Sequence, residues 1–304
     1  MNRPRDNRTQ IVRTAVAGRI APARFHTETL NIDRNGRLTL LPGSGGINLD
    51  VHCGDPVDQW LADHLMVGAS IEDAESLPAS PGALHLLACL GNTVRDAAGR
   101  TIGVVAGKRG GLAPDFFPPN LVAVEMPDTV AELLKPSDRV VVEAYGRGLV
   151  LTDRTELVLA NLSPSLLDAM PLREERDRLV VDVTAILPAR VAGAGLGSDR
   201  WIGDLEITEM EPLIGNTASL HFGDLVAFDG IDARTNRFFN RECIAIGAVA
   251  HGPSPAPGHG VGVTILMTGP RSVLQPQIDS SSGFGAAFRR LTHSIAFATP
   301  DNGH

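Results

Sequence analysis

The chain has 304 residues, of which 43% are apolar, so it can form one large domain or two of ordinary size. A net charge of −8 and 4% aromatic residues argue against nucleic acid and anionic membranes as partners, because both bind basic surfaces. The apolar runs are shorter than a membrane-spanning helix, and the charged N-terminus lacks the apolar core of a signal peptide. The 3 cysteines are scattered and form no disulfide framework. Together these features predict a cytoplasmic protein.

Short apolar runs separated by turn-forming residues predict a chain built mainly from β-strands. The content of 32 glycines and 21 prolines suits many turns between short strands. Strands are predicted at residues 9–20, 37–41, 47–53, 82–90, 101–106, 139–144, 179–187, 225–228, 243–250 and 261–268. Residues 70–81 are acidic and rich in turn formers, so an exposed loop is predicted there.

A few short helices interrupt the predicted strands. Asp55 can cap a helix that begins at Pro56 and continues to His64. Further helices are predicted at 127–135, at 164–170 behind the capping residue Ser163, and at 284–297. The last of these carries apolar residues at helical spacing, which favours a docking helix or an oligomer contact.

These elements predict a mainly β fold, a β-rich α+β class with two packed β-barrel or sandwich-like subdomains. The charged segment 151–178 suits a boundary between domains. We therefore expect an N-terminal β-rich domain at 10–155, a C-terminal β-rich domain at 156–278 and a helical tail at 279–304.

Residues 42–65 hold the densest set of groups able to bind a metal or move a proton. The segment contains Asp50, His52, Cys53, Asp55, Asp58, Asp63 and His64. On a helix, the adjacent Asp63 and His64 would point about 100° apart, so only a loop lets them face one target. The alternative is structural: Asp55 and Asp58 support a helix start, and His64 is a half-buried residue.

The loop at residues 251–263 is a second candidate. His251 ends a predicted strand, and His259 lies between Gly258 and Gly260. Flanking glycines allow a ligand to approach the backbone, and an imidazole can act as acid, base or ligand near neutral pH. A flexible surface loop is the alternative.

Glycine-rich turns supply further candidates. Lys108 lies in a Gly-Lys-Arg-Gly-Gly turn, which is not a P-loop but can bind a carboxylate or act as a base; a solvated hairpin is the alternative. The loop at 193–203 lacks the spacing of a dinucleotide fingerprint, although Asp199 or Asp204 can contribute to a site there. The predicted substrate-binding residues are Gly45, Gly46, Asn92, Gly110, Gly258 and Gly260.

The sequence does not identify a cofactor, and a divalent metal ion is the candidate. No GxSxG or HExxH motif occurs. A metal site would combine distant residues, and the mixed nitrogen and oxygen set of Asp55, His64, His251 and His259 suits zinc or another divalent ion.

Several glycine-rich motifs together resemble a bacterial family, the domain of unknown function 4438. The motifs are LPGSGGINLDV, GDPVDQWLADHL, ACLGN, VAGKRGG and VAHGPSPAPGHGVGVT, and the likeness spans roughly residues 13–276. The resemblance implies a compact, mostly β architecture in two parts and brings no activity. It also implies that His52 is not a shared position, so His52 ranks below the other candidates.

The leading hypothesis is an enzyme that hydrolyses an amide or cyclic amide in a small polar metabolite. Its catalytic residues would be Asp63, His64, Lys108, His251 and His259, with His251 or His259 as base, Asp63 orienting it or a metal, and Lys108 binding a substrate carboxylate. The alternative is a non-catalytic β protein that binds a small ligand or builds a homo-oligomer.

Overall fold

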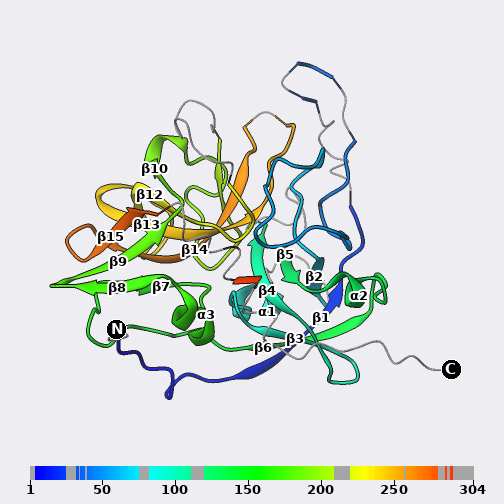
Figure 1. Ribbon diagram of the computed structural model, residues 1–304, viewed down its shortest axis with the longest axis horizontal. Coiled ribbons are helices and arrows are strands. Elements are labelled where there is room, and N and C mark those ends of the chain that lie inside the picture. Colours follow the sequence, from blue (N-terminus) through cyan, green and yellow to red (C-terminus); the bar gives the residue numbers. More distant parts are fainter. Residues whose placement is uncertain are drawn as a thin grey trace.

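The fold is mainly β, as the sequence predicts. The computed structural model describes residues 4–24, 32–33, 35–37, 40–74, 82–110, 120–208, 220–256, 258–279, 285, 288 and 289. These residues form a closed six-stranded barrel, a six-stranded sheet and a three-stranded sheet. Figure 1 shows the barrel on the right and the other sheets on the left, with β4 between them.

The barrel occupies the N-terminal half of the chain. Its strands are β1 (Thr14–Ile20), β2 (Ala69–Asp73), β3 (Thr93–Asp96), β4 (Thr101–Arg109), β5 (Leu121–Glu125) and β6 (Arg139–Ala144). Antiparallel pairing of β1 with β6 closes the ring, so no barrel edge is left exposed. β-Branched residues such as Val94, Val105 and Val142 are fully buried in it.

The C-terminal half forms the two sheets. The larger contains β7 (Val158–Leu159), β10 (Ala185–Pro188), β11 (Leu205–Ile207), β12 (Leu225–Asp232), β13 (Phe238–His251) and β14 (Val261–Pro270). The smaller contains β8 (Leu172–Glu175), β9 (Arg178–Val183) and β15 (Leu274–Ile278). The predicted strand at 179–187 is therefore two strands, because the backbone N–H of Thr184 turns away to donate to the carbonyl of Leu225, 2.8 Å away.

The described helices are short. They are α1 (Gly82–Leu87), α2 (Asp128–Ala131), α3 (Pro164–Ala169) and a 3₁₀ turn, η1 (Ala189–Val191). The cap predicted for α3 is confirmed, since the hydroxyl of Ser163 accepts from the backbone N–H of Leu166 at 3.1 Å. No helix among the described residues is long and apolar enough to cross a membrane. Most of the helix predicted at 284–297 lies outside the described residues.

Strand β4 brings the barrel against the larger sheet. A Cβ atom on Gly107 would lie 2.6 Å from the Cβ of Ala250 in β13, so the two backbones meet closely there. The backbone N–H of Lys108 donates to the hydroxyl of Thr264 in β14, over 2.9 Å. The end of β4 is thereby held beside the loop that joins β13 and β14.

Two local predictions in the loop region before β2 were wrong. Residues 55–64 form turns and no helix, because the backbone of Gly54 and Val57 pairs with Phe222 and Leu220. Residues 47–53 form no strand beyond a single bridge from Ile47 to Ala69. At 37–41, residues 38 and 39 lie outside the described residues, and 40–41 form no strand. Long-range pairing overrides the local pattern in this region.

Two further predictions were wrong near α1. The first residues of the predicted loop at 70–81 belong to β2, which lies between β1 and β5 in the barrel, and residues 75–81 lie outside the described residues. The predicted strand at 82–90 begins with helix α1. The carboxylate of Asp73, at the end of β2, accepts from the backbone N–H of Leu84 at 2.9 Å and so caps the helix from outside its own sequence.

Candidate metal centre

Strand β11 and the residue directly before it contribute two carboxylates to one face. Asp204 and Glu206 are two residues apart, which places their side chains on the same side of the strand. Both are buried, with 5% and 7% of their surface exposed. Glu206 pairs with Gly262 of β14, and Gly262 pairs in turn with His251 of β13. Glu206 and His251 therefore lie on either side of Gly262, which has no side chain.

The loop of residues 42–65 brings Asp63 and His64 to this face. The backbone N–H of Asp63 donates to the carbonyl of Pro42 at 2.9 Å, and that of His64 donates to the carbonyl of Pro253 at 3.2 Å. His64 has a positive φ of 51°, a conformation that is costly for a residue with a β-carbon and is concentrated at functional sites. Because the segment is a loop, Asp63 and His64 can act together.

His64 lies between two carboxylates. Its Nδ1 is 2.5 Å from Oδ1 of Asp63, and its Nε2 is 3.5 Å from Oε1 of Glu206. A carboxylate only accepts hydrogen bonds, so Nδ1 carries the proton that points to Asp63. In the neutral ring, the lone pair of Nε2 then points towards Glu206. Histidines that bind a metal through one ring nitrogen commonly donate the N–H of the other to a carboxylate in this way.

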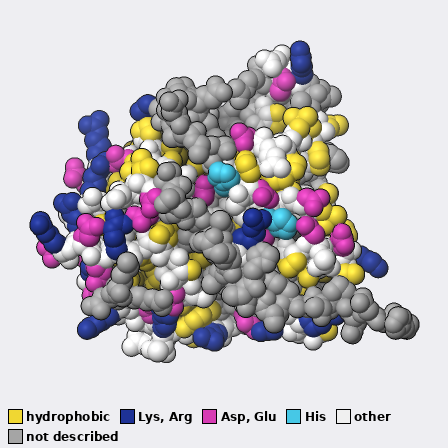
Figure 2. All heavy atoms as spheres, in the orientation of Figure 1, with side chains coloured by type: hydrophobic (Ala, Val, Ile, Leu, Met, Phe, Trp, Pro, Cys, Tyr) yellow, Lys and Arg dark blue, Asp and Glu magenta, His cyan; other side chains and the backbone are white. Residues whose placement is uncertain are grey.

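His259 approaches Glu206 from the loop between β13 and β14. Its Nδ1 lies 3.0 Å from Oε2 and 3.3 Å from Oε1 of Glu206, and the backbone N–H of Gly260 donates to Oε2 over 3.1 Å. The hydrogen bond to Glu206 raises the pKa of His259 above its ordinary value. The His259 side chain is 41% exposed, so solvent reaches the cluster from this side. In Figure 2, histidine side chains reach the surface beside acidic ones in the middle of the face shown.

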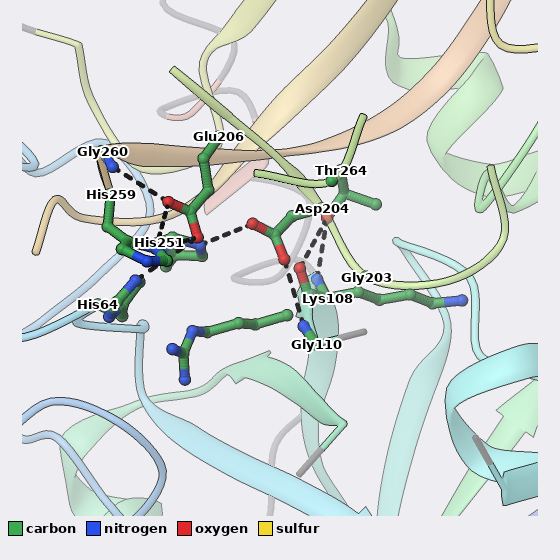
Figure 3. Close-up of polar contacts among 12 residues, drawn as sticks. His64, Lys108, Gly110, Gly203, Asp204, Glu206, His251, His259, Gly260 and Thr264 are labelled. Atoms are coloured by element: carbon green, nitrogen blue, oxygen red, sulfur yellow. Dashed lines mark hydrogen bonds and ion pairs between the residues drawn. The ribbon is translucent and has the colours of Figure 1, made fainter. Parts of the chain in front are cut away.

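His251 lies at the buried end of the cluster. Its Nε2 is 2.9 Å from Oδ2 of Asp204, and its Nδ1 is 2.7 Å from the carbonyl oxygen of Gly252. The carbonyl fixes the proton on Nδ1, which leaves the Nε2 lone pair of the neutral ring facing Asp204. The His64 ring centre is 5.0 Å from that of His251 and 5.5 Å from that of His259. Figure 3 shows the three histidines and two carboxylates pointing towards one another.

The cluster carries more negative than positive charge. Asp63, Asp204 and Glu206 are offset by the guanidinium of Arg109, which is 4% exposed and interacts electrostatically with all three. Burial raises the pKa of Glu206, but hydrogen bonds with His259 and His64 outweigh it and hold that pKa far below its ordinary value. The buried guanidinium of Arg237 also interacts electrostatically with Asp204, so with neutral imidazoles one negative charge remains, which protons or a divalent cation can balance.

The spacing of the cluster fits a divalent cation. Two groups of possible ligand atoms occur among the described residues, one from His64, Glu206 and His259 and one from Asp204, Glu206 and His251, with the atoms of each group within 4.8 Å of one another. Neighbouring ligand atoms around zinc are roughly 3–3.5 Å apart, given bond lengths of about 2.0–2.2 Å. The distances of 2.9–3.5 Å from imidazole nitrogen to carboxylate oxygen match that spacing.

Lys108 is not brought into the cluster. Adjacent residues of β4 point to opposite faces, and Arg109 faces the carboxylates. Figure 3 shows Lys108 pointing away from them. The Lys108 ammonium is fully buried and donates to the carbonyl of His85 at 2.6 Å and to Oδ1 of Asn161 at 2.8 Å. Burial lowers the pKa of Lys108 to about 8. These contacts support a structural role.

The other predicted residues lie in two environments. Gly260 and Gly110 contact the cluster, since Gly110 donates its backbone N–H to Oδ1 of Asp204 at 3.2 Å. Gly258 adjoins His259 in an open turn. Asn92 is used elsewhere, because its side chain bonds to the backbone of Cys89 and Tyr145.

Three predicted residues serve the loop of residues 42–65. Asp55 accepts from the backbone N–H of His52 at 2.7 Å and lies outside both ligand groups. Gly45 and Gly46 have positive φ, and a Cβ atom on Gly45 would lie 2.7 Å from the carbonyl oxygen of Pro22. Of the predicted metal set, the structure therefore brings together His64, His251 and His259.

Two residues of the cluster were missed from the sequence. Glu206 was not considered, although Asp204 and Glu206 flank Leu205 in a short apolar strand, and such an acidic pair on one face is a readable signal. Arg109 was passed over in favour of its neighbour Lys108. Only the packing of β4 against β14 decides which of the two faces the site.

Two family models match consecutive segments of the chain. The N-terminal domain of unknown function DUF4438 matches residues 30–168, and the C-terminal domain of the same name matches residues 169–287. A solved structure described as the crystal structure of TM1086 is 30% identical in sequence, with a TM-score of 0.83 over 91% of this chain and 96% of that one. No curated protein matches the chain. The chain therefore belongs to the DUF4438 family.

Proposed function

We propose that this protein is a metal-dependent hydrolase of a small polar metabolite, with an amide or cyclic amide as the bond that is cleaved. The observation that carries the proposal is the convergence of His64 and His259 on Glu206, in a buried cluster with an excess of carboxylates. A divalent cation held there would supply a water of lowered pKa and polarise a substrate carbonyl.

The residues of the chain have separate parts in this proposal. His64, His259 and Glu206 would hold the cation, and Asp63 would keep the proton on Nδ1 of His64 so that Nε2 is free to bind the cation. The N–H of Gly260 fixes the Glu206 carboxylate. His259, on the exposed side, borders the position at which a substrate arrives. Neither His259 nor His64 serves as a base here, because each is used as a ligand.

Metal content and turnover test the proposal together. The purified chain should hold a divalent ion by elemental analysis and hydrolyse one member of a panel of amides and cyclic amides. A chelator should abolish turnover, and re-addition of zinc or manganese should restore it. His259→Ala should lose both the ion and turnover while its circular dichroism spectrum is unchanged.

His221→Ala is the matched control, since His221 is a partly exposed histidine that pairs with Asp224 away from the cluster. It should retain the ion and the activity. A chain that takes up no divalent ion would contradict the proposal. An ion bound without turnover on any substrate would instead support the alternative of a non-catalytic ligand-binding protein.

A cytoplasmic location and a homo-oligomeric state are parts of the same proposal. All three cysteines, Cys53, Cys89 and Cys243, are free thiols, which suits a reducing compartment. Cell fractionation tests the location, and light scattering on the purified chain tests the oligomeric state.

A further inference from the structure

Glu206 belongs to both groups of possible ligand atoms. One group adds His64 and His259 to it, and the other adds Asp204 and His251. The groups have no other member in common, and a carboxylate has two oxygens that can bind two ions. The cluster therefore contains two sets of possible ligands that share Glu206.

We propose that the centre is dinuclear, with Glu206 bridging an outer cation held by His64 and His259 and an inner cation held by Asp204 and His251. This inference rests on the proposed function, which requires only one cation. Bridged pairs of metal ions about 3.5–4 Å apart are a recurrent hydrolytic arrangement, because both ions can stabilise charge on the reacting oxygens.

The tautomer of His251 supports the inner cation. Its Nδ1 donates to the carbonyl of Gly252, so the Nε2 lone pair of the neutral ring faces the carboxylate of Asp204 at 2.9 Å. Either a proton or a metal cation must therefore lie between Nε2 and the carboxylate, and the position of the ring suits both. His64 repeats the arrangement, with Asp63 behind it and Glu206 in front. Each group thus has its own histidine with a fixed tautomer.

The backbone is shaped around the inner group. A Cβ atom on Gly262 would lie 1.9 Å from Nε2 of His251, so only glycine leaves this nitrogen accessible. Gly110 binds the second oxygen of Asp204 through its N–H, which orients the carboxylate. Two divalent cations would make the cluster positively charged, so this centre also needs an anion from solvent or substrate.

Stoichiometry and magnetic coupling test the inference. The full chain, stripped by a chelator and reloaded with Mn²⁺, should bind two ions per chain, and its electron paramagnetic resonance spectrum should show two coupled ions. Asp204→Asn keeps the acceptor for Gly110 but weakens the inner site, so it should bind one ion and give the spectrum of an isolated Mn²⁺. Asp199→Asn, in the preceding loop and outside both groups, should still bind two.

The outcomes separate the two proposals. One ion per chain in the unaltered protein would overturn the dinuclear centre and leave the proposed function standing. Two uncoupled ions would overturn the shared bridge. Absence of any bound ion would overturn both proposals. Because the first measurement uses the unaltered chain, a variant that fails to fold does not affect this decision.

Discussion

Gly262 lies at the point where three strands of the larger sheet meet the site. Its neighbours across the sheet are Glu206 of β11 and His251 of β13. A larger residue here would push the His251 ring out of the space that it occupies. The glycine is thus as much a determinant of the site as the charged residues around it.

Gly262→Ala should weaken metal binding by at least tenfold and lower the free energy of unfolding by about 1–3 kcal/mol, because the added methyl overpacks the core. Isothermal titration with Mn²⁺ and chemical denaturation measure the two effects. Val263→Ala is the control, since Val263 is the next residue and points to the other face. It should lose stability and keep its metal affinity. Equal metal affinity in both variants would contradict this role of Gly262.

His52, outside the proposed centre, should make stability depend on pH. The hydrogen bond with Glu125, at 3.0 Å, and the one with Asp128 raise the pKa of His52 from 6.5 to about 9. The charged imidazole therefore stabilises the fold fully below pH 6.5, and this contribution is lost as the pH rises through about 9.

The comparison of wild type with His52→Gln tests this dependence. At pH 6 the variant should be less stable by about 1–3 kcal/mol, and near pH 9.5 the difference should shrink by most of that amount. Denaturant titrations at the two pH values provide the measurement. A difference that does not change with pH would show that His52 contributes by packing alone.

At the scale of secondary-structure elements, the two faces of strand β4 contact different parts of the molecule. Arg109 faces the carboxylates of the site, whereas Lys108 faces His85 and Asn161. The buried ammonium satisfies acceptors that come from α1 and from the start of the C-terminal half. Its contacts hold elements together, and they lie on the side away from the proposed metal centre.

Lys108→Met should therefore reduce stability without changing substrate binding. It leaves the carbonyl of His85 and the amide oxygen of Asn161 short of a donor, which should lower the free energy of unfolding by about 1–3 kcal/mol. Metal content and KM should match the wild type. Arg109→Met, its neighbour, should instead raise the affinity for a divalent cation, because it removes a positive charge that faces the three carboxylates. A raised KM in folded Lys108→Met would restore the substrate-binding role predicted from the sequence.

The sequence predicts best those elements whose signals are local. Helix α3 was predicted because its cap, Ser163, directly precedes it, and β6 because it contains three consecutive valines, which favour strands. Helix α1 was missed because Asp73, which caps it, lies in another element. His251 and His259 were predicted from their glycine-rich loop, and His64 from the dense set of acidic residues and histidines around it. Glu206 and Arg109 could not be chosen with the same certainty, since only strand register and packing decide which face they share.

At the scale of the whole molecule, the candidate centre lies where the barrel meets the larger sheet. His64 and Arg109 come from the N-terminal half, and Asp204, Glu206, His251 and His259 from the C-terminal half. Strand β4 joins them through Gly107 against Ala250 and through the bond from Lys108 to Thr264. Figure 1 shows this strand at the centre of the molecule, between the two parts.

This division of the ligands has a consequence for how the family can change during evolution. The boundary between the two matched domains, at residues 168 and 169, runs between His64 and the remaining ligands. A gene rearrangement that separated the domains would leave each product with part of a coordination sphere. Selection for the centre should therefore keep both domains in one chain. We expect a relative that carries the C-terminal domain alone to lack the ligand that His64 provides in the outer group, while it can keep the inner group of Asp204, Glu206 and His251.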